Sequence, residues 1–227
     1  MNQEVESTPR EKVVVVLSGG MDSAVLLSHL AAQGHPLKAV SFNYGQRHVR
    51  ELDSAARLAT AAGVEHTIAD LRGLTPLFGA NSLSDLSVPV PEGHYAEESM
   101  KLTIVPNRNM IMLASAIAWA ISSQFDAVAY GAHSGDHAIY PDCRPEFADA
   151  MSAASLLCDW KPIRLMRPFV QFDKGQIVAL GHDLKTPFEL TWTCYQGGEK
   201  HCGKCGSCTE RQEAFAQAGV VDPVAYV

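Results

Sequence analysis

The 227-residue chain lacks any apolar run that approaches the roughly 20 residues of a membrane-spanning helix. Its first segment, MNQEVESTPREK, is polar and lacks the basic-then-apolar order of a secretory signal peptide. Basic residues are not in excess, because 18 Lys and Arg stand against 25 Asp and Glu and give a net charge of −7. We therefore expect a cytoplasmic protein with neither a nucleic-acid nor a membrane partner.

The composition is that of an ordinary globular protein, with 47% hydrophobic and 19% charged residues. The length suits one large domain, or one domain with a small appendage. Six cysteines are present, and four of them follow residue 193. In the reducing compartment that we expect, clustered cysteines favour metal ligands or catalytic thiols over disulfides.

Apolar strand-like runs alternate with helix-like segments in the first part of the chain. The run VVVVL at residues 13–17 is typical of a parallel strand that is buried on both faces. Two further strands are predicted at residues 37–42 and 65–70, and helices at residues 22–33 and 49–62. This alternation predicts right-handed βαβ units and a parallel sheet.

The second part of the chain begins with residues 71–107, a long connection with weak periodicity, which is usually functional or mobile. A polar, His- and Asp-containing loop at residues 132–145 follows a buried strand, at the sheet edge where ligands bind. The other predicted elements are helices at residues 109–124, 145–159, 174–180 and 209–218 and strands at residues 127–131 and 163–166. We expect an α/β fold with an open parallel sheet and helices on both faces, formed by residues 1–190, and a small C-terminal four-cysteine zinc-binding segment, residues 191–227.

The glycine loop, residues 18–23 with the sequence SGGMDS, joins the first predicted strand to the first predicted helix. Glycines allow backbone amides to approach a phosphate closely, and the start of the helix adds free N–H donors. The hydroxyls of Ser18 and Ser23 are further donors, whereas Asp22 could cap the helix or help to hold a divalent cation. The loop lacks the Gly-Lys-Ser/Thr of a P-loop and the G-x-G-x-x-G of a dinucleotide fold. A plain glycine turn is the alternative.

The four C-terminal cysteines have the spacing C-x(7)-C-x(2)-C-x(2)-C, at Cys194, Cys202, Cys205 and Cys208. Four thiolates so close together favour a closed, structural, tetrahedral Zn²⁺ site. An iron–sulfur cluster or a redox dithiol are the chemical alternatives. Of the other two cysteines, Cys158 is expected to be a buried core thiol, and Cys143 a packing or pocket-wall residue.

Three more segments narrow the family: FNYGQRH at residues 42–48, VPNRN at residues 105–109 and YPDCRPEF at residues 140–147. With the glycine loop and the cysteines, they closely resemble the 7-cyano-7-deazaguanine synthase (QueC) family of the ATP pyrophosphatase, or PP-loop, superfamily. The resemblance covers residues 13–215, in the order of the family's motifs. It implies a fold like that of the adenine nucleotide alpha hydrolases.

The resemblance also implies an activity, that of a ligase which forms C–N bonds in queuosine biosynthesis. ATP adenylates 7-carboxy-7-deazaguanine and releases diphosphate, and ammonia displaces AMP to give an amide. A second ATP activates the amide, and loss of AMP leaves the nitrile. Mg²⁺ with ATP, one structural Zn²⁺ per chain and a homodimer are implied as well.

The same resemblance assigns residues to the site. ATP is expected along Leu17, Ser18, Gly19, Gly20, Met21, Asp22, Ser23, Ala24, Val25, Leu26 and Leu27. The catalytic residues are expected to be Ser18, Asp22, Ser23 and Arg108, the substrate-binding residues Tyr44, Gln46, Arg47, Asp142 and Arg144, and the metal ligands the four C-terminal cysteines.

Each of these assignments has a plainer alternative. The substrate is an anion that attacks an anionic triphosphate, so cations such as Arg108 are needed to offset repulsion. However, Arg47 could simply be solvated, Arg108 could pair with a carboxylate, and Asp142 and Arg144 could pair with each other. The loop histidines His133 and His137 are assigned no metal.

Other functions remain open at this point. The enzyme could stop at the amide or transfer the adenylated deazaguanine to another amine. It could be another member of the superfamily, such as an amidating synthetase or a sulfur-transfer enzyme that acts on transfer RNA. From a different class, it could be a zinc-ribbon binding module attached to an inactive α/β domain.

Overall fold

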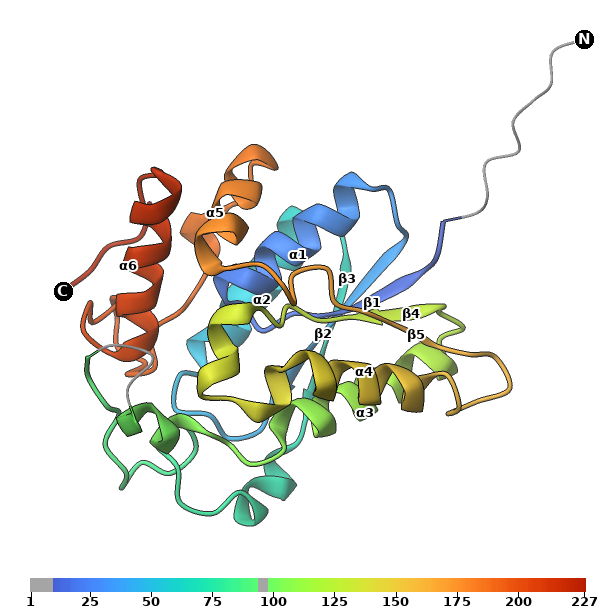
Figure 1. Ribbon diagram of the computed structural model, residues 1–227, viewed down its shortest axis with the longest axis horizontal. Coiled ribbons are helices and arrows are strands. Elements are labelled where there is room, and N and C mark those ends of the chain that lie inside the picture. Colours follow the sequence, from blue (N-terminus) through green and yellow to red (C-terminus); the bar gives the residue numbers. More distant parts are fainter. Residues whose placement is uncertain (1–9, 94–97) are drawn as a thin grey trace, which may run out of the picture.

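The computed structural model describes residues 10–93 and 98–227, so the first nine residues of the predicted polar segment and the short stretch 94–97 lie outside it. Its centre is a five-stranded parallel sheet in the order β3-β2-β1-β4-β5 (Figure 1). The strands are β1 (Val13–Val16), β2 (Leu37–Asn43), β3 (Glu65–Asp70), β4 (Ala127–Ala129) and β5 (Arg164–Met166).

Helices cover both faces of the sheet (Figure 1). One face packs on α1 (Met21–Ala32), α2 (Arg50–Ala61), α5 (Lys174–Asp183) and α6 (Gly206–Ala218). The other face packs on α3 (Arg108–Ser122) and α4 (Pro145–Ser155). The predicted open parallel α/β fold is therefore confirmed.

The valine run of β1 shows why the sheet is buried on both faces. Val13 and Val15 belong to the core beneath α1 and α5, and Val14 belongs to the core above α3. Successive side chains of a strand point to opposite faces, so an alternating pattern would leave one face polar. An unbroken apolar run lets one strand serve two cores at once.

Short 3-10 helices occupy much of what the sequence predicts as loops. They are η1 (Arg72–Leu77), η2 (Glu98–Thr103), η3 (Ser134–Ala138), η4 (Pro141–Cys143) and η5 (Phe188–Leu190). The predicted helix at 145–159 ends earlier, at Ser155. The prediction that Cys158 is a core thiol is wrong, because it lies on the exposed turn beyond this helix.

The segment Glu98–Ser122 is long and apolar enough to cross a membrane by length and composition alone. In the fold it is two elements, η2 and α3, separated by Asn107 in the left-handed conformation with φ 57°. The inner face of α3 contributes Leu113, Ala116, Ile117 and Ala120 to the core. Its apolar composition is therefore explained by packing on the sheet.

The C-terminal segment packs on the α/β domain. Helix α6 lies beside α5 (Figure 1), and its Ala214 and Phe215 belong to the same core as β1. The backbone N–H of Trp192 also donates to the carbonyl oxygen of Gly19, at 2.9 Å. The division of the chain at residue 190 stays a prediction.

Candidate active site

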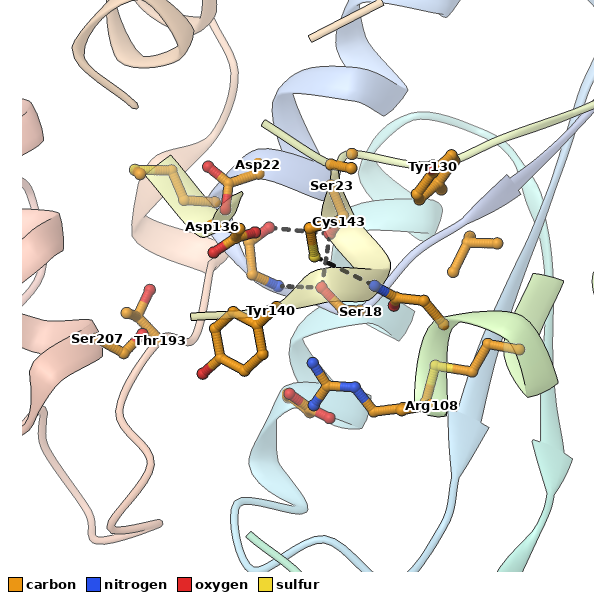
Figure 2. A pocket seen from close by; sticks show the side chains of 18 of the residues that line it. Ser18, Asp22, Ser23, Arg108, Tyr130, Asp136, Tyr140, Cys143, Thr193 and Ser207 are labelled. Carbon is orange, nitrogen blue, oxygen red and sulfur yellow. Dashed lines mark hydrogen bonds between the residues drawn. The ribbon is translucent and has the colours of Figure 1, made fainter. Parts of the chain in front are cut away.

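A cavity opens at the carboxyl ends of β1, β2 and β4, where ligands bind in parallel α/β sheets. The glycine loop forms one side, and residues from the C-terminal segment form the opposite side (Figure 2). Its polar lining includes Ser18, Asp22, Ser23, Tyr44, His48, Glu51, Arg108, Asn109, Tyr130, Asp136, Tyr140, Lys174, Thr193, Tyr195, Ser207 and Arg211.

The glycine loop is held by its own hydrogen bonds. The Oγ of Ser18 accepts from the backbone N–H of Gly20 at 3.2 Å and donates to the Oγ of Ser23 at 3.1 Å. Gly19 has φ 86°, and a Cβ there would lie 2.0 Å from the carbonyl oxygen of Glu51. Only glycine fits this position, because α2 approaches the loop so closely.

Asp22 does not cap α1, whose N-cap is Gly20 without a side-chain hydrogen bond. The Oδ1 of the Asp22 carboxylate is buried without a hydrogen-bond partner among the described residues. Gly20 and the first turn of α1 thus line the cavity beside an incompletely paired carboxylate (Figure 2). This arrangement suits a phosphate chain with its cation.

Arg108, the first residue of α3, extends into the cavity (Figure 2). Its Nη1 donates to the hydroxyl of Tyr44 at 3.2 Å, and the guanidinium lies 5.9 Å from the centre of the Tyr44 ring. Burial raises the pKa of Tyr44 to about 12, so this hydroxyl stays neutral. In the part of the chain that the structure describes, Arg108 forms no ion pair with a carboxylate. An anionic ligand would supply the counter-charge.

A buried charge cluster lies behind the glycine loop. Lys174, at the start of α5, contacts Glu210 and lies 3.6 Å from the Oδ2 of Asp22. Burial opposes its charge, but the two carboxylates outweigh burial and raise the pKa of Lys174. His133 lies beside Asp136 in the same cluster. Lys174 and Glu210 belong to none of the motifs in the sequence and were not predicted as site residues, although a lysine at the start of a predicted helix was available as a signal.

The predicted substrate residues divide into two groups. Tyr44 lines the cavity, but Gln46, Arg47, Asp142 and Arg144 do not. Gln46 is buried, and its side chain contacts the backbone N–H of Tyr44, the carbonyl oxygen of Phe42 and the carboxylate of Glu51. Arg47 donates to the carbonyl oxygens of Asp85 and Val88, which fastens the long connection.

Asp142 and Arg144 shape the loop after β4. The Oδ2 of Asp142 accepts from the backbone N–H of Asn109 at 3.1 Å, near the start of α3. The Nε of Arg144 donates to the carbonyl oxygen of His137 at 2.8 Å. Between them, Cys143 lines the cavity, as expected of a wall residue, and burial raises the pKa of its thiol. This thiol is therefore not activated as a nucleophile.

The four predicted metal ligands come together. The sulfur atoms of Cys194, Cys202, Cys205 and Cys208 lie within 4.8 Å of one another. The Sγ atoms of Cys202 and Cys208 are 3.9 Å apart, and a tetrahedral zinc with Zn–S bonds of about 2.3 Å places its sulfurs about 3.8 Å apart. The cluster therefore has the geometry of a structural metal site.

Neighbouring backbone and rings complete this site. The N–H of Cys202 donates to the sulfur of Cys194, and the N–H of Cys205 to the sulfur of Cys202, each at 3.3 Å. His201 is not a ligand in this arrangement, because its Nε2 accepts from the N–H of Thr193 and its ring packs on Trp192. Burial lowers the pKa of His201 to about 4, so the ring is neutral.

The cysteine cluster and the cavity share a wall. Trp192, Thr193, Ser207 and Arg211 line the cavity, and each lies within three residues of a cysteine of the cluster. Figure 2 shows Thr193 and Ser207 across the cavity from Ser18. The wall, which we call the cysteine wall (residues 191–211), also holds the long connection, since Glu92 bridges to Cys205 and pairs with Lys204 at 2.7 Å.

Comparisons of the sequence with known proteins point to one family. The family model described as "Queuosine biosynthesis protein QueC" matches residues 12–219. A 7-cyano-7-deazaguanine synthase from Marinobacter nauticus is 52% identical over 216 residues, which cover 95% of this chain and 97% of that protein.

Solved structures extend the comparison to the fold. An NMN synthetase from Francisella tularensis aligns with a TM-score of 0.55 at 19% identity, over 94% of this chain and 79% of that one. A 4-thiouridine synthetase, solved with RNA and ATP, aligns with a TM-score of 0.53 at 18% identity, over 92% of this chain and 50% of that one. At such identities the likeness shows the fold alone.

Proposed function

The chain belongs to the QueC family of queuosine biosynthesis proteins, and on that premise we propose that it converts 7-carboxy-7-deazaguanine and ammonia to 7-cyano-7-deazaguanine with ATP. It is then a ligase that forms C–N bonds and yields AMP and diphosphate. The relatives support the nitrile over the amide or an amine conjugate, because they are named for the cyano product.

The reaction proceeds by two activations. A carboxylate oxygen of the substrate attacks the α-phosphorus of ATP, and diphosphate leaves. Ammonia attacks the acyl carbon of this adenylate, loses a proton and displaces AMP, which gives the amide. The amide oxygen then attacks the α-phosphorus of a second ATP and displaces diphosphate, and loss of AMP and of the two amide protons leaves the C≡N bond.

The glycine loop and two cations support the first activation. Loop amides and the hydroxyls of Ser18 and Ser23 would bind the phosphates, with Lys174 behind them. The guanidinium of Arg108 would hold the attacking carboxylate or the α-phosphate, which offsets the repulsion between the two anions. Mg²⁺ neutralises phosphate charge when it accompanies ATP, and Asp22 would hold it through the unpaired Oδ1.

The aromatic lining supports recognition of the deazaguanine. Tyr44, Tyr140 and Tyr195 line the cavity near Arg108 and offer faces for a planar base. Gln46, Arg47, Asp142 and Arg144 would act on the substrate through the loops that they hold. We further propose that the four cysteines bind Zn²⁺, which supplies structure only, and that the protein is a cytoplasmic homodimer.

One observation carries the proposal: the glycine loop and an arginine without a carboxylate partner among the described residues face a single cavity. The test mixes the protein with ATP, Mg²⁺, ammonium and 7-carboxy-7-deazaguanine, and resolves acid, amide and nitrile by mass spectrometry while AMP and diphosphate are counted. Nitrile with two AMP per product is expected. Amide alone would mean a truncated reaction, and no ATP consumption would overturn the assignment of this substrate.

A further inference from the structure

His133 is a fully enclosed side chain for which the reaction above has no use. It lies four residues after the end of β4, and only 1% of its surface is exposed. Its ring lies between the glycine loop and η3, next to two carboxylates that line the cavity, Asp22 and Asp136. Each of the two nitrogens of a buried imidazole at such a position needs a polar partner.

The hydrogen bonds fix which nitrogen carries the proton. The Nδ1 accepts from the backbone N–H of Gly135 at 3.1 Å, as the N-cap of η3. A nitrogen that accepts has no proton, so the proton of the neutral ring is on Nε2. The Nε2 lies 3.3 Å from the Oδ2 of Asp136 and 3.8 Å from the Oδ2 of Asp22.

The packing leaves the ring little freedom to turn. A Cβ at Gly135 would lie 3.0 Å from the ring of His133 and 3.2 Å from the Oε1 of Glu210. The Nζ of Lys174 lies 3.6 Å from the same Oδ2 of Asp22. Two nitrogen groups thus lie within 4 Å of the Oδ2 of Asp22, both beyond hydrogen-bond length, and the Oδ1 has no hydrogen-bond partner among the described residues. The carboxylate nearest to the Nε2 of His133 is that of Asp136.

We propose that His133 is a positioning residue that, through its Nε2–H, orients the carboxylates of Asp22 and Asp136 toward the divalent cation of the bound nucleotide. The inference rests on the proposed function for the identity of that nucleotide. His133 would not touch the nucleotide. It would act as the outer partner that fixes a ligating carboxylate, a role whose loss typically costs about 10- to 100-fold in metal affinity.

Two substitutions distinguish the contribution of the Nδ1 of the ring from that of the Nε2. His133→Asn keeps an oxygen that can accept from the N–H of Gly135 but has no group that reaches the carboxylates. His133→Gln places an amide N–H near the position of Nε2 but lacks the short-range cap. His137→Asn, in the same loop and outside the cavity lining, is the matched control.

The experiment titrates Mn²⁺, followed by electron paramagnetic resonance, into the full-length protein saturated with α,β-methylene-ATP, and records thermal unfolding of each variant. His133→Asn is expected to weaken Mn²⁺ binding by about tenfold or more while the protein stays folded at the temperature of the titration. His133→Gln and His137→Asn are expected to bind Mn²⁺ nearly as the parent does.

Equal Mn²⁺ affinity in His133→Asn and the parent would overturn the inference, as would loss in His133→Gln as large as in His133→Asn. Failure of Mn²⁺ to bind to the parent with this analogue would overturn it too. The proposed function is judged apart from this, by the product assay on the parent. Nitrile formation with unchanged Mn²⁺ binding in His133→Asn would reject the inference alone.

Discussion

The glycine loop and the cysteine wall face each other across one cavity but are held there by different means. The loop follows a strand buried in the middle of the sheet, and its shape depends on backbone contacts such as that of Gly19 with α2. The cysteine wall has no strand of the sheet, and apart from backbone contacts such as that of Trp192 with Gly19 it is held by side chains: four clustered sulfurs and the buried Arg211. The glycine loop should therefore keep its structure when the metal is removed, whereas the cysteine wall should lose its structure.

Gly19→Ala should have the largest effect on stability, because it changes the glycine loop, whose shape depends on backbone contacts. The new Cβ would overlap the carbonyl oxygen of Glu51 at 2.0 Å, in a residue with φ 86°. We expect a loss of about 4 kcal/mol or more in the free energy of unfolding, from overpacking and strain together. Urea unfolding measures it.

Gly63→Ala is the matched control. Gly63 also has a positive φ, 66°, but its Cβ would meet nothing within 4 Å. It should cost only the left-handed backbone penalty of about 1 kcal/mol. If the two variants lost equal stability, close approach of α2 would not be what shapes the loop.

Arg211→Met acts on the opposite wall. Arg211 is completely buried, and its Nε and Nη2 each lie 2.9 Å from the carboxylate of Asp222, while its Nη1 donates to Thr191 at 2.7 Å. Removal of one partner of a buried pair leaves the other uncompensated and should cost about 3 kcal/mol. The double variant Arg211→Met/Asp222→Asn should recover part of that loss. If the stability losses of the two single variants simply added in the double variant, Arg211 and Asp222 would not stabilise each other.

Arg108→Gln tests the cavity between the two walls. Loss of one preorganised charge at a developing anion typically lowers kcat about 100-fold, whereas stability should change little because no carboxylate among the described residues is left unpaired. Arg144→Gln, an exposed arginine outside the cavity lining, should have a clearly smaller effect. Steady-state AMP formation compares the two, and equal losses would count against direct contact by Arg108.

Arg47→Ala should have the smallest effect. Its guanidinium fastens the long connection through the carbonyl oxygens of Asp85 and Val88. Hydrogen bonds of this kind contribute about 1 kcal/mol to stability. Because Arg47 holds a loop and does not line the cavity, we expect a raised KM for the deazaguanine at a nearly unchanged kcat. Substrate titrations give both constants, and a large fall in kcat would place Arg47 at the reacting atoms instead.

The two walls also differ in how far the sequence predicted them. The glycine loop is a local pattern, a buried strand followed by SGG and a helix, and local patterns can be read directly from the chain. The cysteine spacing is local as well, and it predicted the cluster. What it did not predict is that Thr193 and Ser207 line the cavity, because this depends on where the segment packs.

Contacts between distant residues account for the rest. Lys174 meets Asp22 of the glycine loop, and Arg211 meets Thr191 and Asp222, only after the sheet and α6 are in place. Motif membership did not separate cavity residues from loop supports: Tyr44 lines the cavity, whereas Gln46, two residues later, faces the protein interior. Periodicity shows which side of an element is buried, but not which polar groups converge.

Hydrogen exchange on the protein with and without its metal tests the difference between the walls most directly. Binding free energy at a structural metal site is largely folding free energy, so metal removal should release the segment that the metal holds. We expect residues 191–211 and 88–93 to lose protection while β1 and α1 keep theirs. Equal loss across the whole chain, or no loss in the cysteine wall, would contradict the account.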